Sequence, residues 1–426
     1  MSRHNTREAR SRIRSRIAVI VAGAALLSWA GPGANAFWTA VSNGGGAAAV
    51  ADAVAAGTTP STSVSAGNVT LAWTASTTLA GRPVTGYTVA RYSSASGGTK
   101  VPAGGTCAAQ PIAGLGCIDQ GVPTGTWHYT VTPVLGQWQG VESVRSAGAA
   151  VDTTPPGAPT VAAPAYLNST TVTSVPVSGT TEAGASIALT VTDAGAAHTV
   201  TKTVTANGSG AWNAAFDLSS LNAGTVTYSA IATDTAGNKG TAAGTTTSTK
   251  DVTAPAVTAV ALSGGGGNGK DNGKIEPKDK VTLAYSEALD ASTICSSWAA
   301  GASGTVNGNN QVTVTISSRN VLTVTVDSAA CPTWRIGTVG LGIGTNYGPA
   351  TGTVTYKGTG VNASAVSWDS TTNKLTVTLG DVITGNPSNG TEQPAAPSYT
   401  PSDGIKDIAG NSLGLTTFTS TSTSRF

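Results

Sequence analysis

The chain has 426 residues, only 10% of them charged, and a formal net charge of +2. Such sparse charge gives no electrostatic footprint for nucleic acid, so the composition excludes that class of partner. Fifty-four glycines, with abundant Thr, Ala and Val, are typical of short strands and turns rather than helices. Disorder is the alternative, but alternating Val and Thr with tryptophans spread along the chain predict packed cores.

The first 36 residues predict a secretory signal peptide. Residues 1–16 carry six arginines and one glutamate, residues 17–30 (IAVIVAGAALLSWA) are apolar, and residues 34–36 (ANA) supply small residues for cleavage. The apolar run is too short to span a bilayer comfortably. We therefore expect a secreted or cell-surface protein with no membrane span after cleavage; an uncleaved anchor is the alternative. Removing residues 1–36 leaves 17 basic and 20 acidic residues, a net charge of −3.

Residues 37–60 are rich in Ala and Gly and predict a linker. Phe37-Trp38-Thr39 follows the predicted cleavage site, and a Gly run and an Ala run come after it. This stretch resembles the export segments cut by SipW-type signal peptidases, as in camelysin and TasA-like fibre proteins. The resemblance implies that the aromatic residues could pair as a strand with a neighbouring subunit, giving self-assembly. A signal remnant followed by a plain linker is the alternative that we favour.

Residues 61–151 predict the first β-sandwich. Three segments in them, VTLAW, PVTGYTV and TWHYTV, alternate apolar residues in the manner of half-buried strands. Their order resembles a fibronectin type III module, in which Trp73 matches the second-strand Trp, Tyr87 the third-strand Tyr and Tyr129 the late-strand Tyr. The resemblance implies a spacer or binding module outside the cell, and the fold alone does not give a function.

Two similar D-x-T-x-P segments, beginning at Asp152 and Asp251, predict linkers between domains. Proline lacks a main-chain donor and stiffens the chain, so such a segment can pass between sheets without joining either. Residues 152–255 resemble a bacterial Ig-like repeat of the kind strung along surface adhesins. The D-x-A-G-N segment at residues 234–238 predicts a turn that closes a hairpin, and it recurs at residues 407–411.

Residues 256–426 predict a C-terminal Ig-like β domain with a flexible tail. Residues 285–290 (YSEALD) resemble the F-S-E-x-L-D strand of Ig-like domains from S-layer and other surface proteins, with Tyr285 in place of Phe. Later segments with alternating apolar residues continue the β pattern. A region of about 170 residues is long for one sandwich, so an elaborated domain and a domain plus tail both stay open.

The four cysteines predict two disulfides, one in the first domain and one in the last. Cys107 and Cys117 form the first near pair, and Cys295 and Cys331 form the second. An even number of cysteines in an exported chain indicates disulfides. Zinc is the competing interpretation, and it fails on spacing because the chain has no C-x-x-C.

Catalytic motifs are nearly absent, so we expect no enzymatic activity. No G-x-S-x-G elbow marks a nucleophilic serine. His128 alternates with aromatic residues and belongs to the outer face of its strand, while His198 lies in a predicted hairpin. The densest carboxylate pairs are Glu276/Asp279 and Glu287/Asp290. Both pairs fall in a turn or at a strand end, where solvated carboxylates are ordinary.

An aromatic cluster in the first domain suggests carbohydrate binding as an alternative function, because exposed rings stack on apolar faces of ligands. Alternation places Trp127 and Tyr129 on one face, which we expect to be the core. Trp138, in a G-Q-W-Q-G turn, is the better candidate for an exposed ligand-binding ring. Core packing or turn capping is the alternative that we favour for all three.

Calcium is the one cofactor that the sequence leaves open. In one arrangement Gly273 is the sixth residue of a calcium loop, although Lys270 stands where an Asp or Asn ligand belongs. The ligands of that loop would be Asn268, Asn272, Glu276 and Asp279. In the other arrangement the turn that closes the second domain lies near the following linker. The residues of that arrangement are Asp152, Asp234, Asn238 and Asp251. Turn capping alone is the alternative in both cases.

These features predict an all-β chain of tandem Ig-like and fibronectin type III β-sandwiches, arranged as beads on a string. We expect a non-catalytic structural or adhesive protein, secreted or on the surface of a Gram-positive bacterium. The alternatives are a polysaccharide-binding protein and an extracellular fibre subunit that assembles through its N-terminal segment. The expected partners are the cell wall, a glycan or a surface protein.

Overall fold

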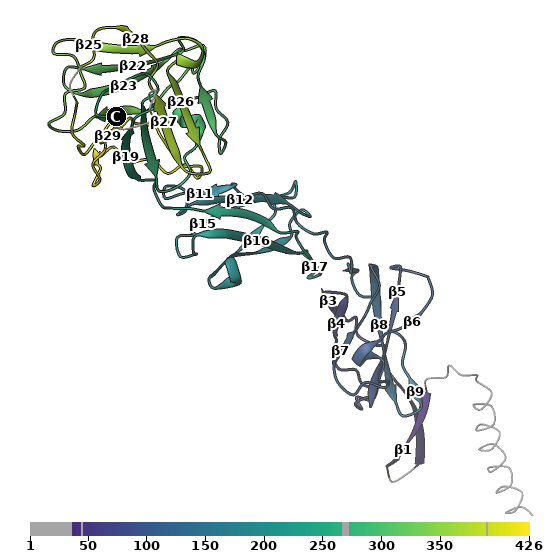
Figure 1. Ribbon diagram of the computed structural model, residues 1–426. Coiled ribbons are helices and arrows are strands. Elements are labelled where there is room, and N and C mark those ends of the chain that lie inside the picture. Colours follow the sequence, from purple (N-terminus) through teal and green to yellow (C-terminus); the bar gives the residue numbers. More distant parts are fainter. Residues whose placement is uncertain (1–35, 44–45, 266–271, 389–390) are drawn as a thin grey trace, which may run out of the picture. The chain divides into compact units, whose positions relative to one another are not determined.

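The computed structural model describes residues 36–43, 46–265, 272–388 and 391–426 (Figure 1). Its regular structure is almost entirely β, and the described residues contain a single short α-helix, α2 (Ala291–Ile294). Two compact units divide the chain: one runs through Gly157 and includes residues 184–186 and 232–241, and the other comprises the remainder. No helix in the described residues is long and apolar enough to cross a membrane.

Residues 36–53 form a β-hairpin, so the predicted linker is wrong over this stretch. β1 (Ala36–Asn43) pairs antiparallel with β2 (Gly46–Ala53), from Ala36 opposite Ala53 to Asn43 opposite Gly46. The aromatic and β-branched residues of β1 favour an extended strand. Two glycines, Gly44 and Gly45, stand between the paired residues Asn43 and Gly46, and Gly-Gly is a hairpin-turn sequence, which outweighs the Ala and Gly content of the segment.

The first sandwich packs a three-stranded sheet, β3-β4-β7, against a five-stranded sheet, β10-β8-β5-β6 with β9 beside β8. Trp73 and Tyr87 lie in its core, and their rings meet edge to face at 5.5 Å. Tyr129 is fully buried beside them. The strands are β3 (Ser61–Ser65), β4 (Asn68–Ala72), β5 (Gly86–Tyr92), β6 (Val101–Pro102), β7 (Gly116–Asp119), β8 (Gly125–Leu135), β9 (Trp138–Gln139) and β10 (Ala149–Val151).

The second sandwich packs the pair β12-β15 against a six-stranded sheet, β11-β18-β16-β13-β14 with β17 beside β16. Trp212, Phe216 and Tyr228 fill its core. Lys250 is 4% exposed, and its Nζ donates to main-chain carbonyls at the end of the sandwich. The strands are β11 (Tyr166–Leu167), β12 (Val175–Thr180), β13 (Ser186–Asp193), β14 (Thr199–Thr205), β15 (Ala211–Phe216), β16 (Gly224–Thr233), β17 (Lys239–Ala242) and β18 (Thr246–Lys250).

The third sandwich packs a five-stranded sheet, β19-β20-β27-β26-β21, against a seven-stranded sheet, β28-β25-β22-β23-β24-β29-β30. One hydrophobic cluster joins its buried residues from Val260 to Phe426. The first seven strands are β19 (Val257–Ser263), β20 (Lys280–Tyr285), β21 (Gly304–Val306), β22 (Val312–Ser317), β23 (Val321–Val326), β24 (Gly337–Gly340) and β25 (Thr353–Lys357). The others are β26 (Ala365–Asp369), β27 (Lys374–Thr378), β28 (Asp381–Thr384), β29 (Ser398–Pro401) and β30 (Phe418–Thr419). The chain is therefore all-β, with tandem sandwiches of the Ig-like and fibronectin type III kind.

The predicted flexible tail is wrong, because the last residues belong to the core of the third sandwich. Phe426 is fully buried, and its ring meets that of Tyr347 edge to face at 5.1 Å. Ser424 exchanges main-chain hydrogen bonds with Ala395 at 2.9 and 3.1 Å. The Thr and Ser residues before Phe426 suggest a solvated tail, but burial of the terminal aromatic ring holds the segment on the sandwich.

Candidate cation site at a joint between sandwiches

The turn at residues 234–238 binds the linker that enters the second sandwich. Asp234 Oδ1 accepts the main-chain N–H of Asn238, and Oδ2 accepts its side-chain amide, both at 2.8 Å. The same Asn238 amide donates to the carbonyl of Asp152 at 3.0 Å. Gly237 has a φ of +92°, a left-handed conformation that glycine adopts without a steric cost.

The turn at residues 407–411 repeats these contacts in the third sandwich. Asp407 accepts the main-chain N–H and the side-chain amide of Asn411, both at 2.8 Å. The Asn411 amide also donates to the carbonyl of Asp251 at 3.0 Å. Two copies of one five-residue motif thus bind two linkers through the same hydrogen bonds.

Both turns also contact the sandwich that precedes them in the chain. The carbonyl of Ala236 accepts the main-chain N–H of Ala66, between β3 and β4, at 2.8 Å. The carbonyl of Ala409 accepts the side-chain amide of Asn168 at 3.0 Å, and Asn411 Oδ1 accepts the N–H of Ser169 at 2.9 Å. Each turn is therefore the element that meets both the linker and the preceding sandwich.

The predicted approach of Asp234 and Asn238 to the following linker is wrong. In the antiparallel pair β16–β18, Gly224 lies opposite Lys250, so Asp251 follows at the starting end of β16. The 234–238 turn lies at the other end of β16, where the chain enters the sandwich. The sequence shows the turn and the linkers, but not which of them the strand direction brings together.

Three carboxylates gather at the second joint. One carboxylate oxygen from each of Asp251, Glu287 and Asp407 lies within 4.8 Å of the other two. This is the one group of three acidic side chains within such a distance among the described residues. Asp251 belongs to the linker, Glu287 follows β20, and Asp407 begins the turn. Asp407 is buried and the other two are half-buried. Only Asp251 is among the residues that the sequence predicts as ligands.

Among the ion pairs of the described residues, none joins a Lys, Arg or His side chain to this acidic cluster. Burial, the charges of Asp251 and Asp407 and a hydrogen bond to Asp251 together raise the pKa of Glu287 to about 7. Glu287 Oε1 is buried without a hydrogen-bond partner. Leaving a buried acceptor unpaired costs about 1–3 kcal/mol, and like charges at this separation oppose ionisation. A bound cation would relieve both costs.

The donor set suits a hard divalent cation, and Ca²⁺ best, because Ca²⁺ accepts six to eight oxygens in irregular, loop-built geometry. Asp251, Glu287 and Asp407 would hold the ion. Asp407 already accepts two N–H groups of Asn411, and Asp251 accepts the N–H of Thr253 at 3.0 Å. These carboxylates retain lone pairs for a metal, and water would complete the shell. The motifs around Glu287 and Asp407 are each visible in the sequence. Local sequence patterns do not show that these two residues, 120 positions apart, lie side by side in the fold.

The described residues of the predicted calcium loop around Gly273 form a hydrogen-bonded turn. Asp279 is 1% exposed, and its carboxylate accepts the main-chain N–H of Glu276 at 2.7 Å. The Asn272 amide lies 3.5 Å from the Glu276 carboxylate. Asn268 lies outside the described residues. These contacts serve the turn, and they do not gather the carboxylates around a common centre.

Of the three aromatic rings considered for glycan binding, only that of Trp138 is exposed. Trp138 is 39% exposed on β9, whereas Tyr129 is fully buried. Trp127 is half-buried; its indole N–H donates to the Pro123 carbonyl at 2.8 Å, and the Arg91 guanidinium lies 5.0 Å from its ring centroid. Trp138 alone keeps the exposure that stacking on a glycan requires.

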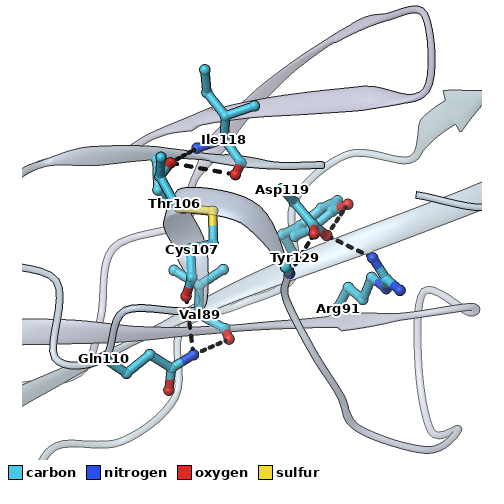
Figure 2. The surroundings of a disulfide bond; sticks show 10 residues. Val89, Arg91, Thr106, Cys107, Gln110, Ile118, Asp119 and Tyr129 are labelled. Carbon is cyan, nitrogen blue, oxygen red and sulfur yellow. Dashed lines mark hydrogen bonds and ion pairs between the residues drawn. A yellow bond between two sulfur atoms is a disulfide. The ribbon is translucent and has the colours of Figure 1, made fainter. Parts of the chain in front are cut away.

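Both predicted disulfides are present, Cys107–Cys117 and Cys295–Cys331. Figure 2 shows the buried polar groups beside the first. The Asp119 carboxylate accepts from Arg91 Nη1 at 2.9 Å and from the Tyr129 hydroxyl at 3.0 Å. Burial, followed by the charge of Asp119, raises the pKa of Tyr129. Removing one partner of such a buried pair would leave an uncompensated buried charge, which costs about 3–5 kcal/mol.

His198 pairs with Asp193 in a hairpin. The His198 Nδ1 lies 2.7 Å from the carboxylate, which also accepts the N–H groups of His198 and Asn222 at 2.9 and 3.0 Å. These main-chain donors lower the pKa of Asp193. Among the hydrogen bonds of the described residues, none joins a serine or threonine hydroxyl to His198, so the pair closes the hairpin and lacks a nucleophile.

No family of known proteins and no curated protein matches the chain. Among solved structures it is similar to the chicken CNTN1 FN1–FN3 domains, with 10% identity over 88% of this chain and 99% of that one, and a TM-score of 0.22. It is also similar to a tetra-tandem repeat from the extending region of a large adhesion protein, with 17% identity over 87% and 91% of the chains and a TM-score of 0.24. A bacterial ice-binding adhesin matches with 16% identity over 74% and 90%, and a TM-score of 0.26. Scores this low do not establish a shared function.

Proposed function

We propose that this chain is a non-catalytic structural or adhesive protein that acts outside the cell of a Gram-positive bacterium. The carrying observation is the repeated joint, in which one motif binds a linker and the preceding sandwich twice along the chain. Sandwiches joined by bare linkers would move freely. Joints held by repeated hydrogen bonds suit a protein that carries a binding surface or bears a load.

Other features support this proposal. Two disulfides fit an oxidising compartment outside the cytosol. The acidic cluster at the second joint suits calcium at extracellular concentrations, because extracellular calcium modules bind in the range of about 10⁻⁴ to 10⁻³ M. Calcium bound there would tie linker, turn and sandwich together.

Localisation tests the proposal. Antibodies raised against the purified chain are applied to intact, unpermeabilised cells of the source organism and to the culture medium. A cell-surface or medium signal that disappears in a deletion strain is the expected result. A signal that requires permeabilised cells would overturn the proposal.

Polysaccharide binding is a second candidate, favoured by the exposure of Trp138. On an array of cell-wall and plant glycans, the chain should bind a set of extended glycans and lose that binding on Trp138→Ala. Leu79→Ala is the matched control, because Leu79 is a 78% exposed apolar residue of the same sandwich. Equal binding by the native chain and Trp138→Ala would exclude this site.

A further inference from the structure

The N-terminal hairpin has two open strand edges. Its sheet consists of β1 and β2 alone, paired over eight residues each, and no other described strand joins it. A two-stranded sheet is marginally stable in water, whereas three or more strands give independent stability. The hairpin therefore has both the geometry and the energetic reason to accept another strand.

The base of the hairpin is fixed on the first sandwich. Asp52 is 2% exposed, and its carboxylate accepts the N–H of Ala80 at 3.0 Å. The N–H of Leu79 donates to the carbonyl of Ala53 at 2.9 Å, and Val54 forms a β-bridge with Thr78. A strand that is already held in place loses less conformational entropy when it binds a partner.

Three of the other edge strands of this protein carry features that discourage pairing. β14 contains Lys202, β6 contains Pro102, and β28 is bulged where Val382 and Thr384 pair with successive residues of β25. Charge, proline and bulges are the usual protection of an exposed edge. Residues 36–51 contain no charged residue and no proline, so the hairpin edges have no such protection in their sequence.

We propose that β1 of one chain pairs antiparallel with β1 of a second copy, which joins two hairpins into one four-stranded sheet. β1 is the pairing strand because its aromatic and β-branched residues favour strands more than the alanines of β2 do. Two uncharged, identical edges meet without electrostatic repulsion. A two-fold axis relates the two copies in this antiparallel pairing.

The interface is small, so the dimer forms at high concentration. Eight residues of strand edge bury less than the roughly 1,200 Å² that stable complexes usually need. Chains anchored side by side on a surface would raise the effective concentration and favour the pairing.

Sedimentation equilibrium tests the proposal. The sample is the full chain, produced by export through its own predicted signal segment. The native chain should show a monomer–dimer equilibrium, which Val41→Lys should weaken at least tenfold by placing like charges in the paired strands. Val144→Lys is the matched control, because Val144 is a 77% exposed valine of the first sandwich outside the hairpin. A native chain that stays monomeric at every concentration, or a dimer that tolerates Val41→Lys, would overturn the proposal.

Hydrogen exchange keeps the proposal testable if Val41→Lys disturbs the hairpin itself. In the native chain, exchange of the main-chain amides of residues 38–43 should slow as the protein concentration rises. Amides of the buried strand β8 should exchange independently of concentration. Concentration-independent exchange in residues 38–43 would overturn the β1 pairing.

Discussion

The side-chain amide of one asparagine makes the decisive contact at each joint. An Asn amide nitrogen carries two N–H groups, and each joint uses one for the turn carboxylate and one for the linker carbonyl. Asp at this position would bring two carboxylates together, and Ala would leave the linker carbonyl without this donor. Asn238 and Asn411 therefore supply the side-chain link between turn and linker at the two joints.

Trp73→Ala tests the core of the first sandwich. Trp73 is 6% exposed and packs edge to face on Tyr87, so its removal leaves a cavity that the neighbouring residues cannot fill. We expect a loss of about 3–5 kcal/mol in the free energy of unfolding, measured by denaturant titration of the first sandwich. An unchanged midpoint would contradict the assignment of Trp73 to the core.

The raised pKa of Glu287 predicts that the stability of the third sandwich depends on pH. The Glu287 pKa of about 7 lies above its ordinary value of 4.5, so between these values the folded state holds a proton that the unfolded state has lost. Stability from this group is therefore present at low pH and falls as the pH rises through that window. In chelator, Glu287→Gln should lose less in melting temperature than the native chain between about pH 5 and about pH 8.

Calcium should offset this loss at the higher pH, because it takes the place of the proton. The calcium-induced rise in melting temperature should disappear in Glu287→Gln and persist in Glu276→Gln, which alters the other predicted calcium loop. Loss of the calcium effect in Glu276→Gln alone would place the ion at the loop around Gly273.

At the scale of elements, alternating apolar residues predict the strands well. The VTLAW segment overlaps β4 over four residues, and the TWHYTV segment lies within β8, because burial of one sheet face imposes a period of two on the sequence. Turn motifs are equally visible, because Gly and Asn supply the left-handed and side-chain-bonded conformations that a turn needs.

The sequence is less informative where distant residues decide the outcome. The composition of the terminal Ser/Thr segment indicates a solvated tail, but the structure packs Phe426 on Tyr347. The N-terminal Ala/Gly segment looks like a linker until β1 and β2 pair in register. Asp251 and Asn411 are 160 positions apart, and only the third sandwich brings them together. Local patterns therefore give the elements, but not the joints between them.

At the scale of the whole molecule, the repeated joint is the feature on which the proposed structural role rests. Each sandwich has its own core, and each linker is bound by the turn of the sandwich that it enters. Proline in the linkers limits their conformations, and the turns supply the hydrogen bonds. In solution, these hydrogen bonds must persist if the joints are to hold.

Small-angle X-ray scattering of the chain with both joint asparagines replaced tests this claim most directly. The Asn238→Ala/Asn411→Ala double variant should give a broader distribution of interatomic distances than the native chain, because both linkers are released. Asn207→Ala is the matched control; Asn207 caps a hairpin turn inside the second sandwich, where its Oδ1 accepts the N–H groups of Ser209 and Ala211. The control should scatter like the native chain. Identical curves for the native chain and the double variant would contradict the account.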